Sequence, residues 1–173
     1  RIADVRDAQA MQALLADFAP HVIYHAAAYK HVPVMEVQPE AAWHTNVLGT
    51  ANVIAAAQQA KTETFVLIST DKAVNPTSVM GASKRMAELV VRSIGEGEGM
   101  NCVITRFGNV LDSNGSVIPL FRRQIEAGGP LTLTHPDVTR YFMTIPEAVQ
   151  LVMEAAATSK GDDIFVFDMG ERV

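Results

Sequence analysis

The sequence lacks several features that mark whole classes of protein. Its 173 residues include one cysteine, Cys102, so an internal disulfide is impossible and a reducing compartment suits the chain. No stretch approaches the roughly 18 to 20 apolar residues of a membrane span, and the N-terminus has no signal-peptide pattern. We therefore expect a soluble segment that is neither a disulfide scaffold nor membrane-spanning.

Positive charge is also scarce. Lys and Arg number 14 and are scattered singly, against 19 Asp and Glu, for a formal net charge of -5. Because no basic stripe is present to neutralise a phosphate backbone, we expect no nucleic-acid partner. With 49% hydrophobic residues, the chain is long enough for one compact core and a small additional lobe, and we predict no metal site.

A glycine-rich phosphate-binding turn is missing too. A doubly wound dinucleotide domain opens with a strand and such a turn, yet no G-x-G-x-x-G precedes the first expected helix. Two interpretations follow: either the cofactor loop lies upstream of this segment, or the chain has no dinucleotide site.

Apolar spacing predicts alternating helices and strands up to Phe107. Met11, Leu14, Leu15 and Phe18 fall three and four apart, which predicts a helix capped by Asp7. The next elements are expected to be a strand at 21–26, a helix at 39–60, a strand at 64–69, a helix at 78–94 and a strand at 102–107. Short apolar strands separated by helices predict an α/β fold with a doubly wound parallel sheet, each strand being apolar on both faces.

The pattern changes beyond Gly108. The expected elements are a loop at 108–116, a helix at 118–127, short strands at 131–134 and 141–144, a helix from Pro146 to just before Gly161, and a strand at 164–167. This part of the chain is predicted to form a small lobe interleaved with the sheet.

Functional groups of open α/β sheets lie beyond the carboxyl ends of the strands. After the strand at 21–26, the small residues Ala26, Ala27 and Ala28 would let a flat ligand lie close to the backbone. From periodicity alone, plain close packing is the simpler explanation of these three residues.

An alcohol, an acid and an amine follow the strand at 64–69, as Thr70, Asp71 and Lys72. Desolvation and mutual charge can tune an Asp and a Lys toward neutral pH, which makes them a candidate acid and base pair. On spacing alone, a surface loop explains the three residues as well.

Met80 and Lys84 lie four residues apart on the next expected helix and share a face, which Gly81 is expected to leave open. A lysine near the crevice can bond a ribose hydroxyl and lower neighbouring pKa values by its charge. A solvated helix lysine is the alternative, and Met80 by itself indicates only a core position.

Glycine-containing loops follow the strand at 102–107. Gly108 and Asn109 come first, and the segment from Gly115 to Pro119 opens a helix whose free backbone donors could hold a diphosphate. A loop that merely turns explains the glycines equally well. Arg140 could grip a phosphate or stack on a base, or form a surface salt bridge.

Four long segments together carry a resemblance. They are HAAAYKHVPVMEVQPEAAWHTNVLGT, STDKAVNPTSVMGASKRMAE, TRFGNVLDSNGSVIPLF and HPDVTRYFMTIPEAVQLV. In this order they resemble, over essentially the whole chain, the polysaccharide-biosynthesis nucleotide-sugar dehydratases that act on UDP-N-acetylglucosamine. The resemblance implies a Rossmann-type NAD(P)-binding domain, present in part at 1–107, and a nucleotide-sugar-binding lobe with returning strands and helices at 108–173.

The reaction that the resemblance implies is an internal redox cycle. A base takes the proton of the sugar's 4-hydroxyl while hydride from carbon 4 reduces the nicotinamide of NAD or NADP. Water is eliminated across carbons 5 and 6, and the hydride returns to carbon 6. The product is a UDP-4-keto-6-deoxy sugar for surface polysaccharide.

The resemblance also implies roles for single residues. Lys72 matches the base, Asp71 matches the acid that helps the 6-hydroxyl leave, and Thr70 orients the 4-hydroxyl. The expected cofactor-lining residues are Asp4, Val5, Ala26, Ala27, Ala28, Lys30, Thr45, Ser69 and Lys84, with Asp4 and Val5 at adenine and Lys84 at the ribose. The expected substrate-binding residues are Lys30, Thr70, Asn109, Ser116, Val117, Ile118, Pro119 and Arg140.

Met80 stands where the wider superfamily has its catalytic tyrosine, and we count it with the catalytic positions for that reason. A thioether can neither donate nor remove a proton, so an inactive enzyme is one interpretation. We favour another, because the chain resembles the long, membrane-anchored branch that has methionine here and whose Asp-Lys pair does the proton work. That branch has transmembrane helices upstream, so the resemblance implies a location on the cytoplasmic side of a bacterial inner membrane. A homo-oligomer is also expected.

Two other functions stay open at this point. Close relatives that share most of these motifs are UDP-sugar 4-epimerases, and a nucleotide-sugar-binding fragment without chemistry is the non-enzyme alternative. The missing glycine-rich turn leaves the cofactor affinity of this segment undecided. The choice between NAD and NADP is open as well, because the residue that discriminates them is expected after the second strand, upstream of Arg1.

Overall fold

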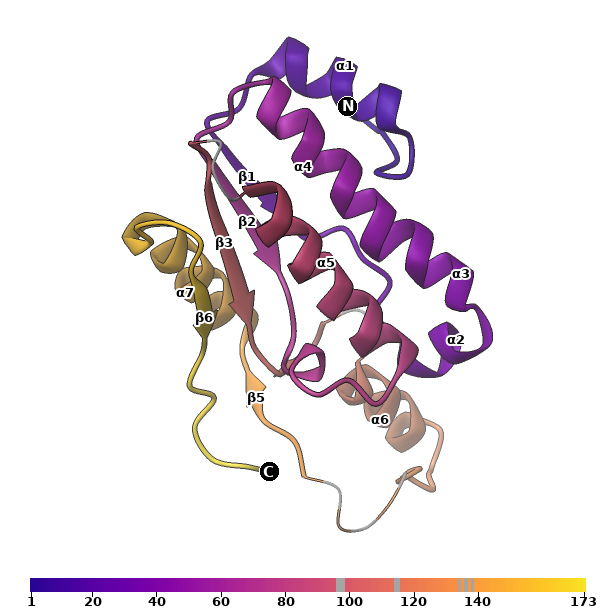
Figure 1. Cartoon of the computed structure of the whole chain (residues 1–173). Helices are drawn as coiled ribbons and strands as arrows, with labels where there is room; N and C mark the ends of the chain where they lie inside the picture. Colours follow the sequence, from indigo (N-terminus) through magenta and orange to yellow (C-terminus); the bar gives the residue numbers. More distant parts are fainter. Residues whose placement is uncertain (96–98, 114–115, 134, 136, 138) are drawn as a thin grey trace.

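The computed structural model describes residues 1–95, 99–113, 116–133, 135, 137 and 139–173. Its main sheet has four strands in the order β1 (Val22–His25), β2 (Thr64–Ile68), β3 (Asn101–Arg106) and β6 (Ile164–Val166). All neighbouring strands are parallel, with Val22 opposite Thr64, Phe65 opposite Cys102 and Ile104 opposite Ile164. The predicted parallel sheet is confirmed (Figure 1).

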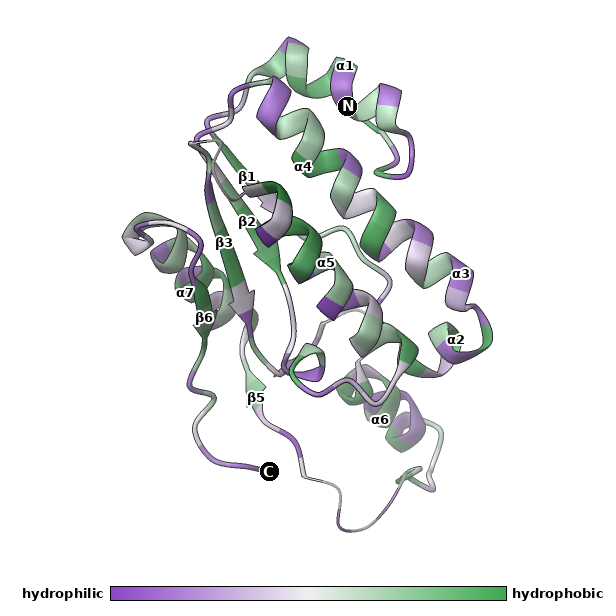
Figure 2. Cartoon of the chain, in the orientation of Figure 1, coloured by the Kyte–Doolittle hydropathy of each residue, from purple (hydrophilic) through white to green (hydrophobic). Residues whose placement is uncertain are grey.

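Helices cover both faces of this sheet. On one face lie α1 (Ala8–Phe18), α4 (Gly49–Gln59) and α5 (Val79–Gly95), and on the other lies α7 (Ile145–Thr158) (Figure 1). Side chains of β2 point alternately to the two helical layers. Phe65 and Leu67 pack in the core on the side of α1, α4 and α5, while Val66 packs with Val152 of α7. Figure 2 shows the strands as mostly hydrophobic, as expected for a sheet between two helical layers.

The first helix follows the predicted capping. The Asp7 carboxylate accepts a hydrogen bond from the Ala10 backbone N–H at 3.0 Å, and α1 ends at Phe18, before Pro20. Met11 and Leu15 are its buried positions, and both belong to the main core cluster. The helix therefore forms where the cap and the apolar spacing predict it.

The region expected as one long helix, 39–60, is helical throughout but not uniform. It consists of α3 (Pro39–Ala42), the π-helix η1 (Trp43–Leu48) and α4. Apolar spacing does not reveal such a segment, because a π turn adds only about one residue to the local repeat. Segments of this kind are common at functional sites, and Thr45 lies inside this one.

One element was not expected, and two expectations were wrong. Residues 31–37 contain a short helix, α2 (Val32–Val37), that was not predicted. The expected loop at 108–116 contains a strand, β4 (Asn109–Val110), which pairs in parallel with β5 (Phe142–Met143). Residues 131–133 form no strand, since the Thr132 N–H donates to the Gln124 side chain at 3.2 Å; Thr134 lies outside the described residues.

The small lobe is built beyond the carboxyl ends of the main strands. It contains β4, β5 and α6 (Val117–Glu126), and β6 then returns to the main sheet (Figure 1). The chain's last residue is held to this part, because Arg140 and Val173 exchange two backbone hydrogen bonds of 2.9 Å.

The strands differ in how far they are buried. Phe65, Val66 and Val103 of β2 and β3 are fully buried, as predicted, but Val22 and Tyr24 of β1 are 43% and 48% exposed. The prediction that every strand is apolar and covered on both faces is therefore wrong for β1, since α7 packs against β2 and β3. Across the described residues, no helix combines the length and apolarity needed to cross a membrane.

Candidate functional site

The polar turn after β2 is rigidly connected to its neighbours. Residues Asp71–Ala73 form the 3-10 turn η2, and the Thr70 hydroxyl caps it by accepting from the Lys72 backbone N–H at 3.4 Å. The same hydroxyl donates to the Asp71 carboxylate at 2.9 Å. The Asp71 N–H donates to the Phe107 carbonyl at 3.0 Å, which fixes the turn to the segment after β3.

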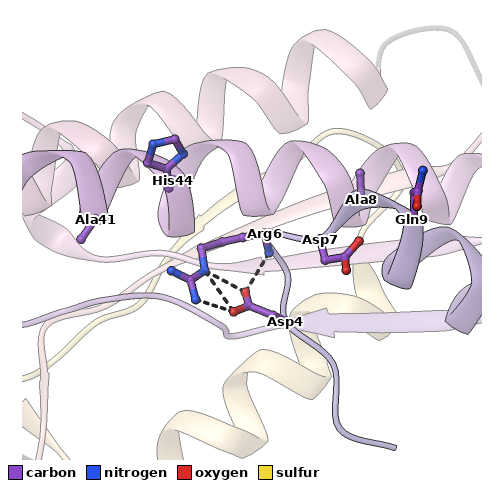
Figure 3. A pocket seen from close by; sticks show the side chains of 7 residues that line it. All are labelled: Asp4, Arg6, Asp7, Ala8, Gln9, Ala41 and His44. Carbon is purple, nitrogen blue, oxygen red and sulfur yellow. Dashed lines mark hydrogen bonds and ion pairs between the residues drawn. The ribbon is translucent and has the colours of Figure 1, made fainter.

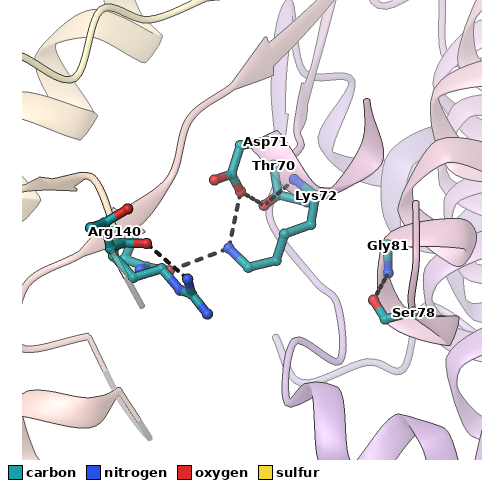
Figure 4. Close-up of polar contacts among 8 residues, drawn as sticks. Thr70, Asp71, Lys72, Ser78, Gly81 and Arg140 are labelled. Atoms are coloured by element: carbon teal, nitrogen blue, oxygen red, sulfur yellow. Dashed lines mark hydrogen bonds and ion pairs between the residues drawn. The ribbon is translucent and has the colours of Figure 1, made fainter. Parts of the chain in front are cut away.

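The side chains of this turn meet the segment that follows β3. Lys72 Nζ lies 3.0 Å from Asp71 Oδ1 (Figure 4). It also lies 3.3 Å from Asn109 Oδ1. The side chains of Lys72 and Asp71 are 33% and 46% exposed, so a ligand can reach both. The predicted acid, base and Asn109 are therefore brought together at the carboxyl edge of the sheet, in a geometry that allows proton transfer.

Lys84 lies under this edge and not in solvent. Its residue is 7% exposed, and its amino group donates to the Ile68 carbonyl at 2.6 Å, two residues before Thr70. Burial lowers the pKa of Lys84 to about 8, and the nearby Glu88 charge partly opposes that shift. The alternative of a solvated helix lysine is therefore wrong.

Met80 points into a hydrophobic cluster. It is 4% exposed and packs with Met35 and Ala42, where α2 and α3 meet α5. Gly81 leaves no open face, contrary to the prediction, because a Cβ there would lie 2.5 Å from the Lys72 carbonyl oxygen. The glycine lets the η2 turn approach α5 closely, and the Gly81 N–H donates to Ser78 Oγ at 3.1 Å (Figure 4).

The loop after β1 is held by an asparagine that the sequence analysis missed. Asn46, which is 1% exposed, accepts from the Tyr29 N–H at 2.7 Å and donates to the Tyr29 carbonyl at 3.0 Å. It also donates to Ser83 Oγ of α5 at 2.9 Å. The sequence gives no clear signal for this role, since other polar residues such as His44, Thr45 and Asn52 occur in the same helical stretch.

The small residues before Tyr29 remain accessible. Ala26 and Ala27 are exposed and Ala28 is half-buried, so simple close packing does not explain the first two. Their accessibility fits the predicted approach of a flat ligand to this loop.

An open hollow of about 750 Å³ lies between the start of α1 and the helical stretch 39–48 (Figure 3). Its lining residues are Asp4, Arg6, Asp7, Ala8, Gln9, Ala41 and His44. Hydrogen bonds from the Arg6 side chain and backbone lower the pKa of Asp4 to about 2, so its carboxylate is charged at neutral pH. The predicted adenine contact Asp4 therefore borders a cavity, while Val5 packs close beside Gly49.

Thr45 supports the fit of a polar ligand near this hollow. It follows His44 in the sequence, it is 8% exposed, and its hydroxyl has no hydrogen-bond partner in the described part of the chain. Buried hydroxyls are normally hydrogen-bonded, so an unpaired one at a predicted cofactor position fits a ligand that supplies the missing partner.

The predicted substrate residues form a looser group. Lys30 Nζ donates to Ser113 Oγ at 3.2 Å, which joins the loop after β1 to the loop after β4, and burial lowers the Lys30 pKa. Arg140 is exposed, its guanidinium donates to the Thr139 carbonyl at 2.8 Å, and it lies on the side toward which the Lys72 amine points (Figure 4). In the described residues neither side chain contacts the Asp71–Lys72 pair.

A helix begins where the sequence predicted an anion-binding helix N-terminus. It is α6, which starts at Val117 after the N-cap residue Ser116. Gly115 lies outside the described residues. Among those described, the buried Ser116 hydroxyl has no partner. Val117 is 38% exposed, and Ile118 and Pro119 are half-exposed, so this end of the helix is accessible to a ligand.

One further carboxylate lies behind the site. Glu88 has no exposed side-chain surface and accepts hydrogen bonds from Ser69, Arg85 and Arg106. Burial raises the pKa of Glu88, but these hydrogen bonds, that from Arg106 foremost, lower it more, so the carboxylate is ionised. The Ser69 hydroxyl, expected among the cofactor-lining groups, is turned toward this carboxylate.

The parallel sheet with helices on both faces and polar groups at its carboxyl edge is a Rossmann-like α/β fold, which solved dehydratases and epimerases of the extended short-chain dehydrogenase class share. Within that class, the chain belongs to the Polysaccharide biosynthesis protein family, whose match extends over residues 1–173.

Curated relatives agree with this assignment. The chain is 59% identical over 172 residues to the probable polysaccharide biosynthesis protein EpsC of Bacillus subtilis, covering 99% of this chain and 29% of the relative. It is 54% identical over 173 residues to the capsular polysaccharide biosynthesis protein CapD of Staphylococcus aureus, with the same two coverages, 99% and 29%. It is also 46% identical over 148 residues to a UDP-glucose 4-epimerase of Rickettsia akari, covering 83% of this chain and 43% of the relative.

Solved structures show the same fold. Pen from Bacillus thuringiensis superposes with a TM-score of 0.91 at 35% identity, covering 98% of this chain and 52% of that one. DesIV from Streptomyces venezuelae, a dTDP-glucose 4,6-dehydratase solved as a double mutant with NAD bound, has a TM-score of 0.90 at 25% identity, covering 99% and 58%. The chain thus spans less than two thirds of each of these proteins, and 29% of the first two relatives.

Proposed function

We propose that this chain carries the proton-transfer site of a nucleotide-sugar 4,6-dehydratase that acts on UDP-N-acetylglucosamine with NAD or NADP, for surface polysaccharide biosynthesis. The observation that carries the proposal is the position of the Lys72 amine, 3.0 Å from the Asp71 carboxylate and 3.3 Å from Asn109 at the carboxyl edge of the sheet. The family, the names of the curated relatives and the NAD-bound dehydratase structure support it.

The cofactor would lie along the same edge. Lys84 would bind the nicotinamide ribose, Ala26 and Thr45 would line the middle of the site, and Asp4 would face adenine at the open hollow. When bound, a nicotinamide held by these residues would supply reversible hydride transfer, from sugar carbon 4 and back to carbon 6. The unpaired Thr45 hydroxyl and the accessible Ala26 fit this placement.

The residues of the η2 turn supply the proton transfers. Thr70 orients the sugar's 4-hydroxyl, and Lys72, in its neutral form, takes the proton of that hydroxyl as carbon 4 is oxidised. Lys72 then passes that proton to the Asp71 carboxylate 3.0 Å away, which makes Lys72 a base again and Asp71 an acid. Lys72 takes the proton that elimination removes from carbon 5 as the hydroxyl leaves carbon 6, and it returns this proton to carbon 5 when the hydride reaches carbon 6. Asp71, in its protonated form, gives the leaving oxygen the proton that makes it water.

The UDP part would be held by the small lobe. Lys30 and Arg140 would supply positive charge for the diphosphate, or the planar guanidinium of Arg140 would stack on uracil. The accessible N-terminus of α6 would offer backbone donors. The remaining contacts would come from Asn109, Ser116, Val117, Ile118 and Pro119. In this arrangement Asn109 touches both Lys72 and the substrate, which couples substrate binding to the position of the base.

The proposal is tested by turnover in the full-length protein. With UDP-N-acetylglucosamine, we expect a keto-sugar product that absorbs in alkali, and Lys72→Ala and Asp71→Asn should each reduce kcat on the order of a hundredfold or more. Lys160→Ala is the matched control, because it removes an exposed lysine that precedes the amino end of β6, away from the carboxyl edge where the candidate site lies. Unchanged turnover in Lys72→Ala would contradict the assigned base.

A UDP-sugar 4-epimerase is the second candidate, and the name of the Rickettsia akari relative favours it. An epimerase would convert UDP-N-acetylglucosamine into UDP-N-acetylgalactosamine without loss of water. Product mass separates the two functions, because the dehydratase product is lighter by one water and the epimerase product has an unchanged mass.

A further inference from the structure

Two side chains one helical turn apart on α5 hold two consecutive residues at the end of β2. Lys84 donates to the Ile68 carbonyl at 2.6 Å, and Glu88 accepts from the Ser69 hydroxyl at 2.6 Å. Thr70, Asp71 and Lys72 follow directly. The segment that leads into the candidate proton-transfer turn is therefore attached to α5 at two adjacent residues.

Glu88 also holds the end of the neighbouring strand. Arg106, the last residue of β3, donates to it twice, from Nε at 2.9 Å and from Nη2 at 2.6 Å. Such a two-bond guanidinium–carboxylate pair fixes direction as well as distance. Asn109, which accepts from the Lys72 amine, is three residues beyond Arg106.

The burial of this carboxylate indicates that its hydrogen bonds are essential to the fold around it. The Glu88 side chain is 0% exposed and that of Arg106 is 12% exposed, whereas Arg85, the third partner, is 37% exposed. A buried carboxylate is costly unless donors satisfy it, and removing one donor leaves the others to rearrange. A change at Ser69 or Arg106 is thus transmitted to both strand ends.

We propose that Glu88 is a positioning residue: by binding Ser69 and Arg106 together, it sets the distance between the Thr70–Lys72 turn and Asn109. Glu88 itself touches neither of the reacting side chains Asp71 and Lys72. The effect on turnover rests on the proposed function, whereas the effect on the geometry of the turn does not. The two parts can therefore be tested separately.

The test uses Ser69→Ala in the full-length protein, because it removes one hydrogen bond from Glu88 without leaving an unpaired charge. Thr62→Ala is the matched control: Thr62 is 3% exposed, lies before β2 at the opposite edge of the sheet, and its hydroxyl has no partner in the described residues. Glu88→Gln is the stronger variant, and Ser69→Ala decides the matter if Glu88→Gln does not fold.

We expect Ser69→Ala to reduce kcat about 10-fold or more, while the KM for the UDP-sugar changes less than about twofold. The reason is that a displacement of reacting groups by up to about 1 Å lowers the rate of the chemical step more than it weakens substrate binding. Amide hydrogen exchange at Asp71, whose N–H donates to the Phe107 carbonyl, should become faster. Thr62→Ala should change neither quantity.

Two results would overturn the proposal: a kcat of Ser69→Ala within about twofold of wild type, or an equal loss of kcat in the Thr62→Ala control. If the wild-type protein does not turn over the UDP-sugar, the proposed function fails and amide exchange alone decides. Faster exchange at Asp71 in Ser69→Ala, with none in Thr62→Ala, then supports the positioning role, and unchanged exchange refutes it.

Discussion

Gly81→Ala is the substitution for which the structure makes the sharpest prediction. The added Cβ would lie 2.5 Å from the Lys72 carbonyl oxygen, where ordinary van der Waals contact begins at 3.4 Å. The neighbour is backbone, so the η2 turn and α5 must separate by nearly an ångström. Because Lys72 belongs to that turn, its amine moves relative to Asn109.

The expected effect on activity is much larger than the effect on stability. Alanine is favoured over glycine inside a helix by about 1 kcal/mol, which offsets part of the roughly 1 to 3 kcal/mol that overpacking costs. A displacement of about 1 Å at reacting groups lowers the rate on the order of a hundredfold. We therefore expect a folded protein with strongly reduced kcat.

The assay compares kcat with UDP-N-acetylglucosamine and the denaturant midpoint for Gly81→Ala and for Ala82→Ser. Position 82 is exposed on the same helix, so its variant adds one atom without touching the η2 turn. A kcat of Gly81→Ala within about threefold of wild type would refute the argument, because it would mean that the position of Lys72 is not critical.

Three further predictions concern stability. Burial and the charge of Lys84 lower the pKa of His25 to about 4 from its ordinary 6.5. Between these two pH values the unfolded chain therefore binds a proton that the folded chain does not. The free energy of unfolding should fall as the pH drops from about 6.5 to about 4. The loss is on the order of 3 kcal/mol, and His25→Gln should flatten the dependence of Tm on pH in this window; an unchanged slope would contradict it. The capping box of α7 predicts that Thr144→Ala lowers the free energy of unfolding by about 1 kcal/mol in a urea titration. The hydrogen bonds that the Glu147 carboxylate accepts from the Thr144 N–H and hydroxyl lower the pKa of Glu147. The stability that this carboxylate contributes is therefore present at neutral pH and is lost as the pH falls through the Glu147 pKa. A free energy of unfolding that does not fall in acid would contradict this prediction.

The parts of the fold that were predicted correctly depend on local chemistry. The Asp7 cap, the spacing of Met11 and Leu15, and the short apolar strands act within a few residues, so they can be read along the chain. The errors arose where a distant partner decides the structure. Asn109 lies in a strand because Phe142 pairs with it, and residues 131–133 form no strand although their composition suits one.

The candidate site divides in the same way. Thr70, Asp71 and Lys72 were found because they follow a buried strand, and strand ends place groups at one edge of a parallel sheet. The core position predicted for Met80 is confirmed, since it packs with Met35 and Ala42. The burial of Lys84 could not be inferred from its helical spacing, since a solvated and a buried face of a helix can have the same repeat.

Sequence alone determined which candidate groups follow the strands and in what order they occur, because residue type and turn position are local properties. Tertiary structure decided which of them meet. The contact between Lys72 and Asn109 joins residues 37 positions apart, and the one between Ser69 and Glu88 joins residues 19 apart. Such contacts form only when β2, β3 and α5 pack together, since burial of their apolar faces sets the register that brings the polar ends within hydrogen-bonding distance.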